Sequence, residues 1–233
     1  MKVRKHWYGL YFLTIAGVLI IAYGGSKAVT TIAELTPMEE RCCVVVDAGH
    51  GGIDGGAISC TRIPESTYNL EIALRLSDLL HFLGYDTRMI RTEDISIYTK
   101  GETIAEKKIS DLKERVRIVN ETKNAILVSI HQNTFSDSRY NGAQVFYAAT
   151  AGSEQLAKQI QAAFAAIYNT GNNRKCKKTR GVYLLDHIAK PGVLVECGFL
   201  SNPSEEKQLR SADYQKKISC VIASSISVFL SNT

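Results

Sequence analysis

The chain has 233 residues, of which 45% are hydrophobic and 22% are charged, and its formal net charge is +5 at pH 7. This composition excludes an intrinsically disordered chain and is ordinary for a globular protein with a sizeable core. The mild positive charge would suit an anionic polymer or membrane surface, although a solvated surface with no charged partner explains it more simply. No nucleic-acid-binding motif accompanies the charge, so we expect no nucleic-acid partner.

An apolar segment lies near the N-terminus, at residues 7–23, and Lys2, Arg4 and Lys5 precede it. As a helix, its 17 residues would extend about 26 Å, near the lower limit for crossing the hydrocarbon core of a bilayer. The basic residues favour keeping this end in the cytoplasm and sending the rest outward. The pattern fits both an uncleaved membrane anchor and a cleaved signal peptide, and either one predicts a domain outside the cytoplasm.

The rest of the chain alternates between strand and helix patterns. The predicted order is strand Cys42–Val46, helix Ser66–Leu83, strand Tyr85–Ile90, helix Ile104–Glu121, strands Ala125–Ile130 and Gly142–Ala148, helix Ser153–Tyr168, a polar basic loop Asn169–Arg180, strands Gly181–Leu185 and Val193–Cys197, and helix Ser211–Leu230. Alternating strands and helices indicate an α/β fold with a layered sheet. We therefore expect residues 1–24 to be the signal or anchor, 25–41 a polar stem, and 42–233 a single domain.

Three apolar strands end in residues that can ionise. His50 ends the segment VVVDAGH, His131 ends ILVSIH, and Glu196 lies near the end of VLVEC. Ligands gather at the carboxyl ends of strands in open α/β sheets, so these side chains would meet if the three strands were parallel neighbours. Glu65, at the start of the first long helix, is a fourth candidate.

Two histidines and one acid form a common ligand set for catalytic zinc, with one position left open for water. A further carboxylate would carry the proton to the leaving amine. The sequence offers two acids, Glu65 and Glu196, and the chemistry alone does not decide which is the ligand and which is the base. The glycine-rich loop GHGGIDGG is also compatible with a phosphate-binding nest, but it lacks the Lys of a Walker loop.

These residues lie within motifs that resemble the zinc-dependent N-acetylmuramoyl-L-alanine amidases of the amidase-3 family, and the likeness covers residues 43–230. The segments that carry it are, in order, VVVDAGHGGIDGGA, ESTYNLEIALRLSDLL, ERVRIVN, ILVSIHQN and VLVECGFLSNPSEE. The resemblance implies one mixed, mostly parallel sheet flanked by helices. It also implies that His50, Glu65 and His131 bind Zn²⁺ and that Glu196 is the catalytic acid/base. The reaction implied is hydrolysis, by zinc-activated water, of the amide bond between the lactyl group of muramic acid and L-alanine in peptidoglycan.

Within the family, the segments KKISDLKERVRIVN and SDSRYNGAQVFYAAT resemble the germination-associated branch that acts on spore cortex. That resemblance implies a lipoprotein activator and an extracytoplasmic location, including the forespore intermembrane space, with membrane contact if the N-terminal helix is uncleaved. Other zinc-dependent peptidoglycan peptidases or deacetylases, and a non-catalytic wall-binding module, remain as alternatives. We also expect Asp54, Arg115 and Asn133 to orient the ligands or shape the loops, and Cys197 to be a buried packing residue.

Overall fold

The computed structural model describes residues 41–168 and 174–232. Its strands are β1 (Cys43–Ala48), β2 (Asp86–Met89), β3 (Ala125–Asn133), β4 (Gln144–Tyr147), β5 (Lys177–Lys178) and β6 (Gly192–Phe199). Its helices are α2 (Glu65–Phe82), α3 (Ile104–Glu121), α4 (Ser153–Tyr168), α5 (Tyr183–His187), α6 (Pro203–Leu209) and α7 (Ala212–Ser231). The predicted anchor or signal and most of the predicted stem lie outside the described residues. Within the described ranges, no helix combines the length and apolar content needed to cross a membrane.

The strands form one sheet in the order β2-β1-β3-β6-β4-β5. β1, β2, β3 and β6 pair in parallel, whereas β4 runs antiparallel to β6 and pairs in parallel with β5. This arrangement confirms the predicted mixed, mostly parallel sheet. The parallel centre is buried on both faces, which explains why its strands are continuous apolar runs in the sequence.

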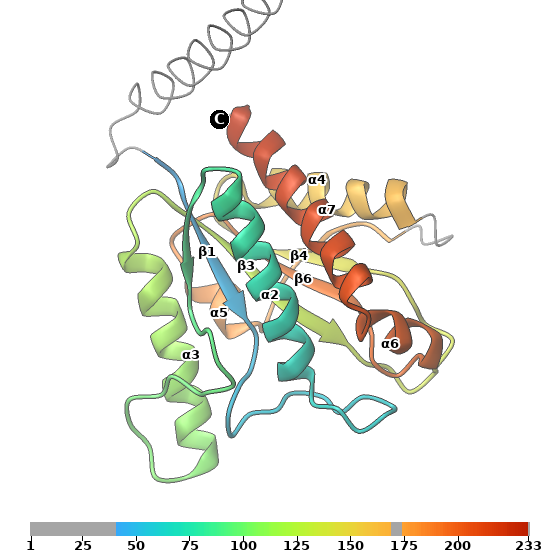
Figure 1. Cartoon of the computed structure of the whole chain (residues 1–233). Helices are drawn as coiled ribbons and strands as arrows, with labels where there is room; N and C mark the ends of the chain where they lie inside the picture. Colours follow the sequence, from blue (N-terminus) through green and yellow to red (C-terminus); the bar gives the residue numbers. More distant parts are fainter. Residues whose placement is uncertain (1–40, 169–173, 233) are drawn as a thin grey trace, which may run out of the picture. The chain divides into compact units, whose positions relative to one another are not determined.

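Helices cover both faces of the sheet and divide the core in two. The larger core packs α2, α4 and α7 on one face, and Figure 1 shows α2 and α7 crossing in front of the strands. The smaller core packs α3 and α5 on the other face. Successive side chains of a strand point to opposite faces, so Val44 and Val46 enter the larger core and Val45 enters the smaller one.

Most predicted elements are found close to their expected bounds, but the predicted strand Gly181–Leu185 is wrong. The short helix α5 occupies residues 183–187, where the Asp186 carboxylate accepts a hydrogen bond from the Gly181 amide. Leu184 and Leu185 are adjacent and both buried, which a half-buried strand would not allow. A short apolar run does not distinguish strand from helix. The helix α6 and the two-residue strand β5 were not predicted.

Candidate metal centre

The three predicted strand ends lie side by side at one edge of the sheet. β3 is the parallel neighbour of both β1 and β6, with Ala48 opposite Ile130 and His131 opposite Glu196. His50 follows the end of β1 by two residues and thus reaches the same edge. Ser129 and Leu194, two residues before His131 and Glu196, face α3 and α5, so the pleat turns His131 and Glu196 toward that face as well.

His50, Glu65 and His131 converge on one point. Each offers a ligand atom, and these atoms all lie within 4.8 Å of one another. His50 Nε2 is 3.3 Å from Glu65 Oε2, and His131 Nδ1 is 2.9 Å from Glu65 Oε1. The two imidazole rings meet edge to face, with their centroids 4.9 Å apart. Glu65 reaches the histidines because it is the first residue of α2, and Ser66 and Tyr68 in the same turn are buried.

A carboxylate fixes the orientation of His50. Asp54 Oδ2 lies 2.8 Å from His50 Nδ1, which leaves Nε2 directed at Glu65. Burial opposes protonation of His50, but hydrogen bonds to Glu65 and Asp54 outweigh it and raise the pKa of His50 to about 9. The backbone of His50 has φ 60°, a left-handed conformation that is uncommon for a residue with a side chain and often marks a functional site.

Glu65 is held by many donors. Its Oε1 accepts hydrogen bonds from the Asn69 side chain and the Gln132 amide, both at 3.1 Å, in addition to its contact with His131. Its Oε2 accepts a hydrogen bond from the Ala57 amide at 3.0 Å. Burial favours the neutral acid, but the hydrogen bonds from the two histidines prevail and hold the pKa of Glu65 well below its usual range. The carboxyl is therefore a fixed anion.

Glu196 has a different environment, although it is paired in register with His131. The residue is partly exposed, yet its Oε2 is buried and has no hydrogen-bond partner among the described residues. Burial is the main cause that raises the pKa of Glu196 to about 7, with the charge of Glu65 adding to it and the two histidines opposing it. A buried carboxylate oxygen without a hydrogen-bond partner is costly and needs an explanation, and a role in proton transfer would provide one.

Two buried arginines hold the loop after β1 in place, and only Arg115 was predicted from the sequence to have a supporting role. Arg115 from α3 pairs with Asp47 and donates hydrogen bonds to the carbonyls of Ala48 and His50. Arg91 donates to the carbonyls of Ala48 and Gly49. Burial opposes ionisation of Asp47, but the Arg115 charge holds the pKa of Asp47 below its usual value. Side-chain donors thereby hold the backbone that presents His50.

Glycine is required between Asp47 and His50 by close packing. A Cβ at Gly49 would lie 2.1 Å from His131 Nε2, so the imidazole ring rests directly against the glycine backbone. This contact leaves Nδ1 as the ring nitrogen that faces Glu65.

Two other residues expected near the site lie away from the ligands. Cys197 points into the larger core and is buried, as expected. Asn133 accepts from the Thr134 amide, a local contact in the loop after β3.

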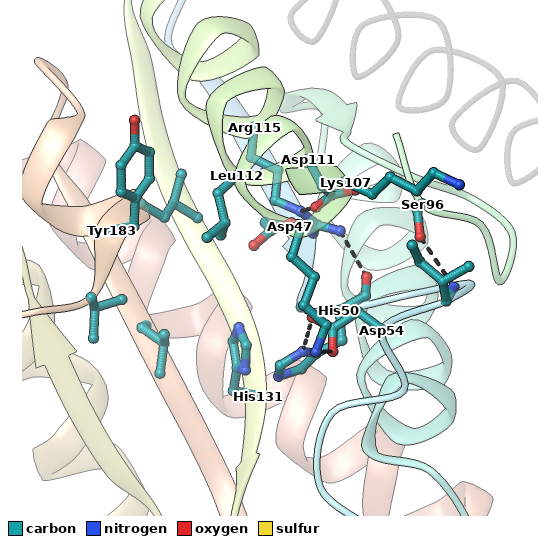
Figure 2. Close-up of a pocket in the computed structure, with 16 residues that line it drawn as sticks. Asp47, His50, Asp54, Ser96, Lys107, Asp111, Leu112, Arg115, His131 and Tyr183 are labelled. Carbon is teal, nitrogen blue, oxygen red and sulfur yellow. Dashed lines mark hydrogen bonds and ion pairs between the residues drawn. The ribbon is translucent and has the colours of Figure 1, made fainter. Parts of the chain in front are cut away.

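A pocket opens beside these residues on the face covered by α3 and α5. His50, His131 and Asp54 lie at one end of it and Tyr183 lies across from them (Figure 2). The pocket encloses a cavity of about 190 Å³ and reaches Lys107 and Lys108 on α3. A substrate group placed here would lie next to both histidines.

Comparison with known proteins places this arrangement in a family. Residues 44–228 match the family model described as N-acetylmuramoyl-L-alanine amidase. The germination-specific N-acetylmuramoyl-L-alanine amidase of Bacillus subtilis is 37% identical over 182 residues, which cover 77% of this chain and 76% of that protein.

Two solved structures resemble the described domain closely. The CwlD amidase of Clostridioides difficile, solved in complex with the GerS lipoprotein, has a TM-score of 0.78 and 38% identity, and the match covers 82% of this chain and 99% of that one. The catalytic domain of the amidase CwlV of Bacillus (Paenibacillus) polymyxa has a TM-score of 0.68 and 31% identity, with coverage of 81% and 98%. The chain therefore belongs to the N-acetylmuramoyl-L-alanine amidase family and is a peptidoglycan amidase.

Proposed function

We propose that this amidase cuts the bond between the lactyl group of N-acetylmuramic acid and L-alanine with Zn²⁺ bound by His50, Glu65 and His131. In this proposal Glu196 is the catalytic acid/base. The observation that carries the proposal is the convergence of three ligand atoms within 4.8 Å, at the strand edge where Glu196 stands opposite His131.

The three ligands fit zinc in chemistry, and the pair formed by His50 and Glu65 also fits it in spacing. Two imidazole nitrogens and one carboxylate oxygen are a common ligand set for catalytic zinc. Ligand atoms about 2.1 Å from one ion at tetrahedral angles lie about 3.4 Å apart, and His50 Nε2 is 3.3 Å from Glu65 Oε2. The contact between Asp54 and His50 Nδ1 is the kind of support that metal-binding histidines usually receive. When bound, zinc would polarise the amide carbonyl and make water a stronger acid.

Glu196 is suited to move the proton. Its buried Oε2 has no partner among the described residues and is available for the attacking water. A cation at the three ligands would favour ionised Glu196, so the free carboxylate is the starting form. The ionised Glu196 can accept the proton of water, and because burial favours the neutral acid, it can then deliver that proton to the L-alanine nitrogen.

A Glu196→Gln variant of the full chain tests this assignment, because the amide keeps the shape of the side chain and removes its basicity. We expect zinc content to remain one ion per chain and the release of stem peptides from muropeptides to fall about 10²–10⁴-fold, the usual contribution of a general acid/base. Glu154→Gln, at an exposed residue of α4, is the matched control. Full activity in Glu196→Gln would refute the role of Glu196. Products that lack a free L-alanine terminus would instead favour a peptidase or deacetylase.

We further propose that the substrate is spore cortex peptidoglycan and that a lipoprotein assists the enzyme. The germination-specific relative and the CwlD–GerS complex support both points.

Action on peptidoglycan requires a location outside the cytoplasm. In this proposal residues 1–24 serve as a signal or anchor, 25–41 as a stem and 42–233 as the catalytic domain. The N-terminal residue of the mature protein distinguishes cleavage from anchoring. Zinc affinity measured with and without the lipoprotein tests its role.

A further inference from the structure

The turn that follows His50 brings Asp54 back to the His50 ring. The Gly51 amide donates a hydrogen bond of 2.7 Å to the Asp54 carbonyl, and the Asp54 amide donates one of 3.2 Å to the Gly51 carbonyl. Gly51 and Gly52 have φ of 131° and 58°, conformations that residues with side chains rarely adopt. Because glycine is also the residue with the greatest backbone freedom, the position of Asp54 depends on what else holds this turn closed.

A segment from beyond β2, residues 94–97, holds the turn from outside. The Ser96 hydroxyl donates a hydrogen bond of 2.6 Å to the Gly51 carbonyl and accepts one of 3.2 Å from the Ile53 amide. The Asp94 carboxylate accepts a hydrogen bond of 3.0 Å from the Gly52 amide. Figure 2 shows Ser96 at the rim of the pocket with the bond that its hydroxyl accepts. Two side chains thus bind three successive residues of the turn.

Close packing fixes where this segment lies against the turn. A Cβ at Gly52 would lie 2.6 Å from the Ser96 amide nitrogen and 2.8 Å from Ser96 Oγ. A Cβ at Gly51 would lie 2.4 Å from the Ile95 carbonyl oxygen. The two glycines therefore let the Ser96 hydroxyl come within hydrogen-bond distance of the main chain.

The same segment is anchored to α3. The Ile97 amide donates a hydrogen bond of 2.7 Å to Asp111 Oδ1, and Asp111 Oδ2 pairs with Arg115 at 2.6 Å. Arg115 also donates to the His50 carbonyl. The backbone of His50 and the segment that carries Ser96 consequently share one anchor, and Ser96 is half-buried in a fixed place.

Asp54 is the group through which Ser96 can act on the candidate metal centre. The Gly51 carbonyl accepts hydrogen bonds from both the Asp54 amide and the Ser96 hydroxyl, so one oxygen joins the two residues. The Asp54 carboxylate lies 2.8 Å from His50 Nδ1 and 2.7 Å from Lys108 Nζ. A turn that opened at Gly51 would release the carboxylate from His50.

Resting on the proposed function, we propose that Ser96 is a positioning residue for the zinc site. Its hydroxyl closes the turn 51–54 and thereby holds the Asp54 carboxylate against His50. The single hydrogen of this hydroxyl is already donated to the Gly51 carbonyl. Ser96 therefore acts on the metal through Asp54 and His50, and not by contact with the metal.

A double-mutant cycle tests the proposal, because substitutions in residues that act as one unit do not add. The zinc affinity of the full chain is measured by competition with a chelator for the parent, Ser96→Ala, Asp54→Asn and the double variant. We expect Ser96→Ala alone to lower the affinity about tenfold, the lower end for groups that support metal ligands. In the Asp54→Asn background, Ser96→Ala should change the affinity by less than about twofold, the scatter of additive pairs.

Two more variants separate the hydroxyl from general effects of substitution. Ser96→Thr keeps the hydroxyl and should retain most of the zinc affinity. Ser138→Ala, at an exposed serine between β3 and β4, is the matched control and should bind zinc like the parent. Thermal unfolding of the zinc-free proteins is followed in parallel, and Ser96→Ala should keep a midpoint close to that of the parent.

Three results would overturn the proposal. They are parent-like zinc affinity in Ser96→Ala, equal losses in Ser96→Ala and Ser96→Thr, and a double variant in which the two separate losses multiply. The proposed function is judged on the parent, by its zinc content and its release of stem peptides. If the parent binds zinc and cleaves but Ser96→Ala binds zinc equally well, only the role of Ser96 falls. If the parent binds no zinc, the proposed zinc site falls and the role of Ser96 falls with it.

Discussion

The contact between Gly49 and the His131 ring offers a sharp test of the candidate metal centre. A Cβ at this position would lie 2.1, 2.3 and 2.6 Å from three atoms of the imidazole. Gly49 does not adopt the left-handed backbone conformation, since its φ lies outside the range in which side chains are strained. Gly49→Ala therefore acts through one steric contact and not through backbone strain.

The displacement can be worked out from the structure. To reach an ordinary van der Waals separation of 3.4 Å from 2.1 Å, the ring has to recede by about 1.3 Å. β3 is paired on both sides, so its backbone resists the shift and the His131 side chain has to rotate. Ligand groups generally need to be held within about 0.5 Å of the productive geometry. We expect zinc affinity to fall at least about 100-fold, the upper end for changes in groups that support metal ligands.

The assay is competition for zinc against a chelator of known affinity, with thermal unfolding of the zinc-free protein followed in parallel. Gly55→Ala is the matched control, because it lies in the same loop, has no left-handed φ, and would place its Cβ an ordinary 3.4 Å from Pro64. Gly55→Ala should bind zinc like the parent. If Gly49→Ala also binds zinc within a few fold of the parent, then His131 is not a ligand in the position described, and the argument from packing is wrong.

Three further substitutions separate support of the metal centre from stability. Asp54→Asn removes the anion that orients His50, and we expect zinc affinity to fall 10–100-fold in a chelator titration, with the unfolding midpoint little changed. Asp47→Asn removes the fully buried one of the two carboxylate partners of Arg115 and should lower the free energy of unfolding by about 3 kcal/mol at pH 7 in urea. Because the pKa of Asp47 is lowered from 3.8, its stabilisation is present above about pH 4 and is lost as pH falls through the folded pKa, so the parent and Asp47→Asn should converge in acid. Leu76→Ala, at a fully buried residue of α2, should cost about 2–5 kcal/mol while the folded fraction keeps its zinc affinity; a selective loss of zinc would contradict the separation of core from site.

The elements that the sequence predicted well are those with long, regular patterns. The helices Ile104–Glu121 and Ser153–Tyr168 have the expected bounds, since many periodic positions define each of them. Apart from β6, which was predicted as the strand Val193–Cys197, the elements between residues 177 and 209 were predicted least well. They are short, and their form depends on tertiary contacts, such as the hydrogen bond from the Gly181 amide to Asp186 that a local pattern does not reveal.

The groups that support the candidate site were also harder to predict than its ligands. The segment after β1 is held by Arg91 and Arg115, which lie 43 and 67 residues beyond Ala48 in the chain. Both donate hydrogen bonds to backbone carbonyls. Every residue has a carbonyl, so the sequence does not show which of them accept a hydrogen bond from a side chain. Arg115 was singled out only through a family motif, and Arg91 was not singled out at all. A buried arginine that binds main-chain atoms becomes recognisable only when the fold has brought it to its acceptors.

The two glutamates show why residue type alone could not assign the chemistry. The residue types alone did not decide which of Glu65 and Glu196 is the metal ligand and which is the general base. The fold gives them opposite surroundings: Glu65 receives hydrogen bonds that lower its pKa, whereas the buried Oε2 of Glu196 has no partner among the described residues and its pKa rises to about 7. A carboxylate that binds a metal has to be ionised, and a proton carrier needs a pKa near the working pH. Pairs of like groups whose surroundings separate their pKa values are characteristic of acid/base sites. The difference in surroundings agrees with the proposal that Glu65 is the ligand and Glu196 the proton carrier.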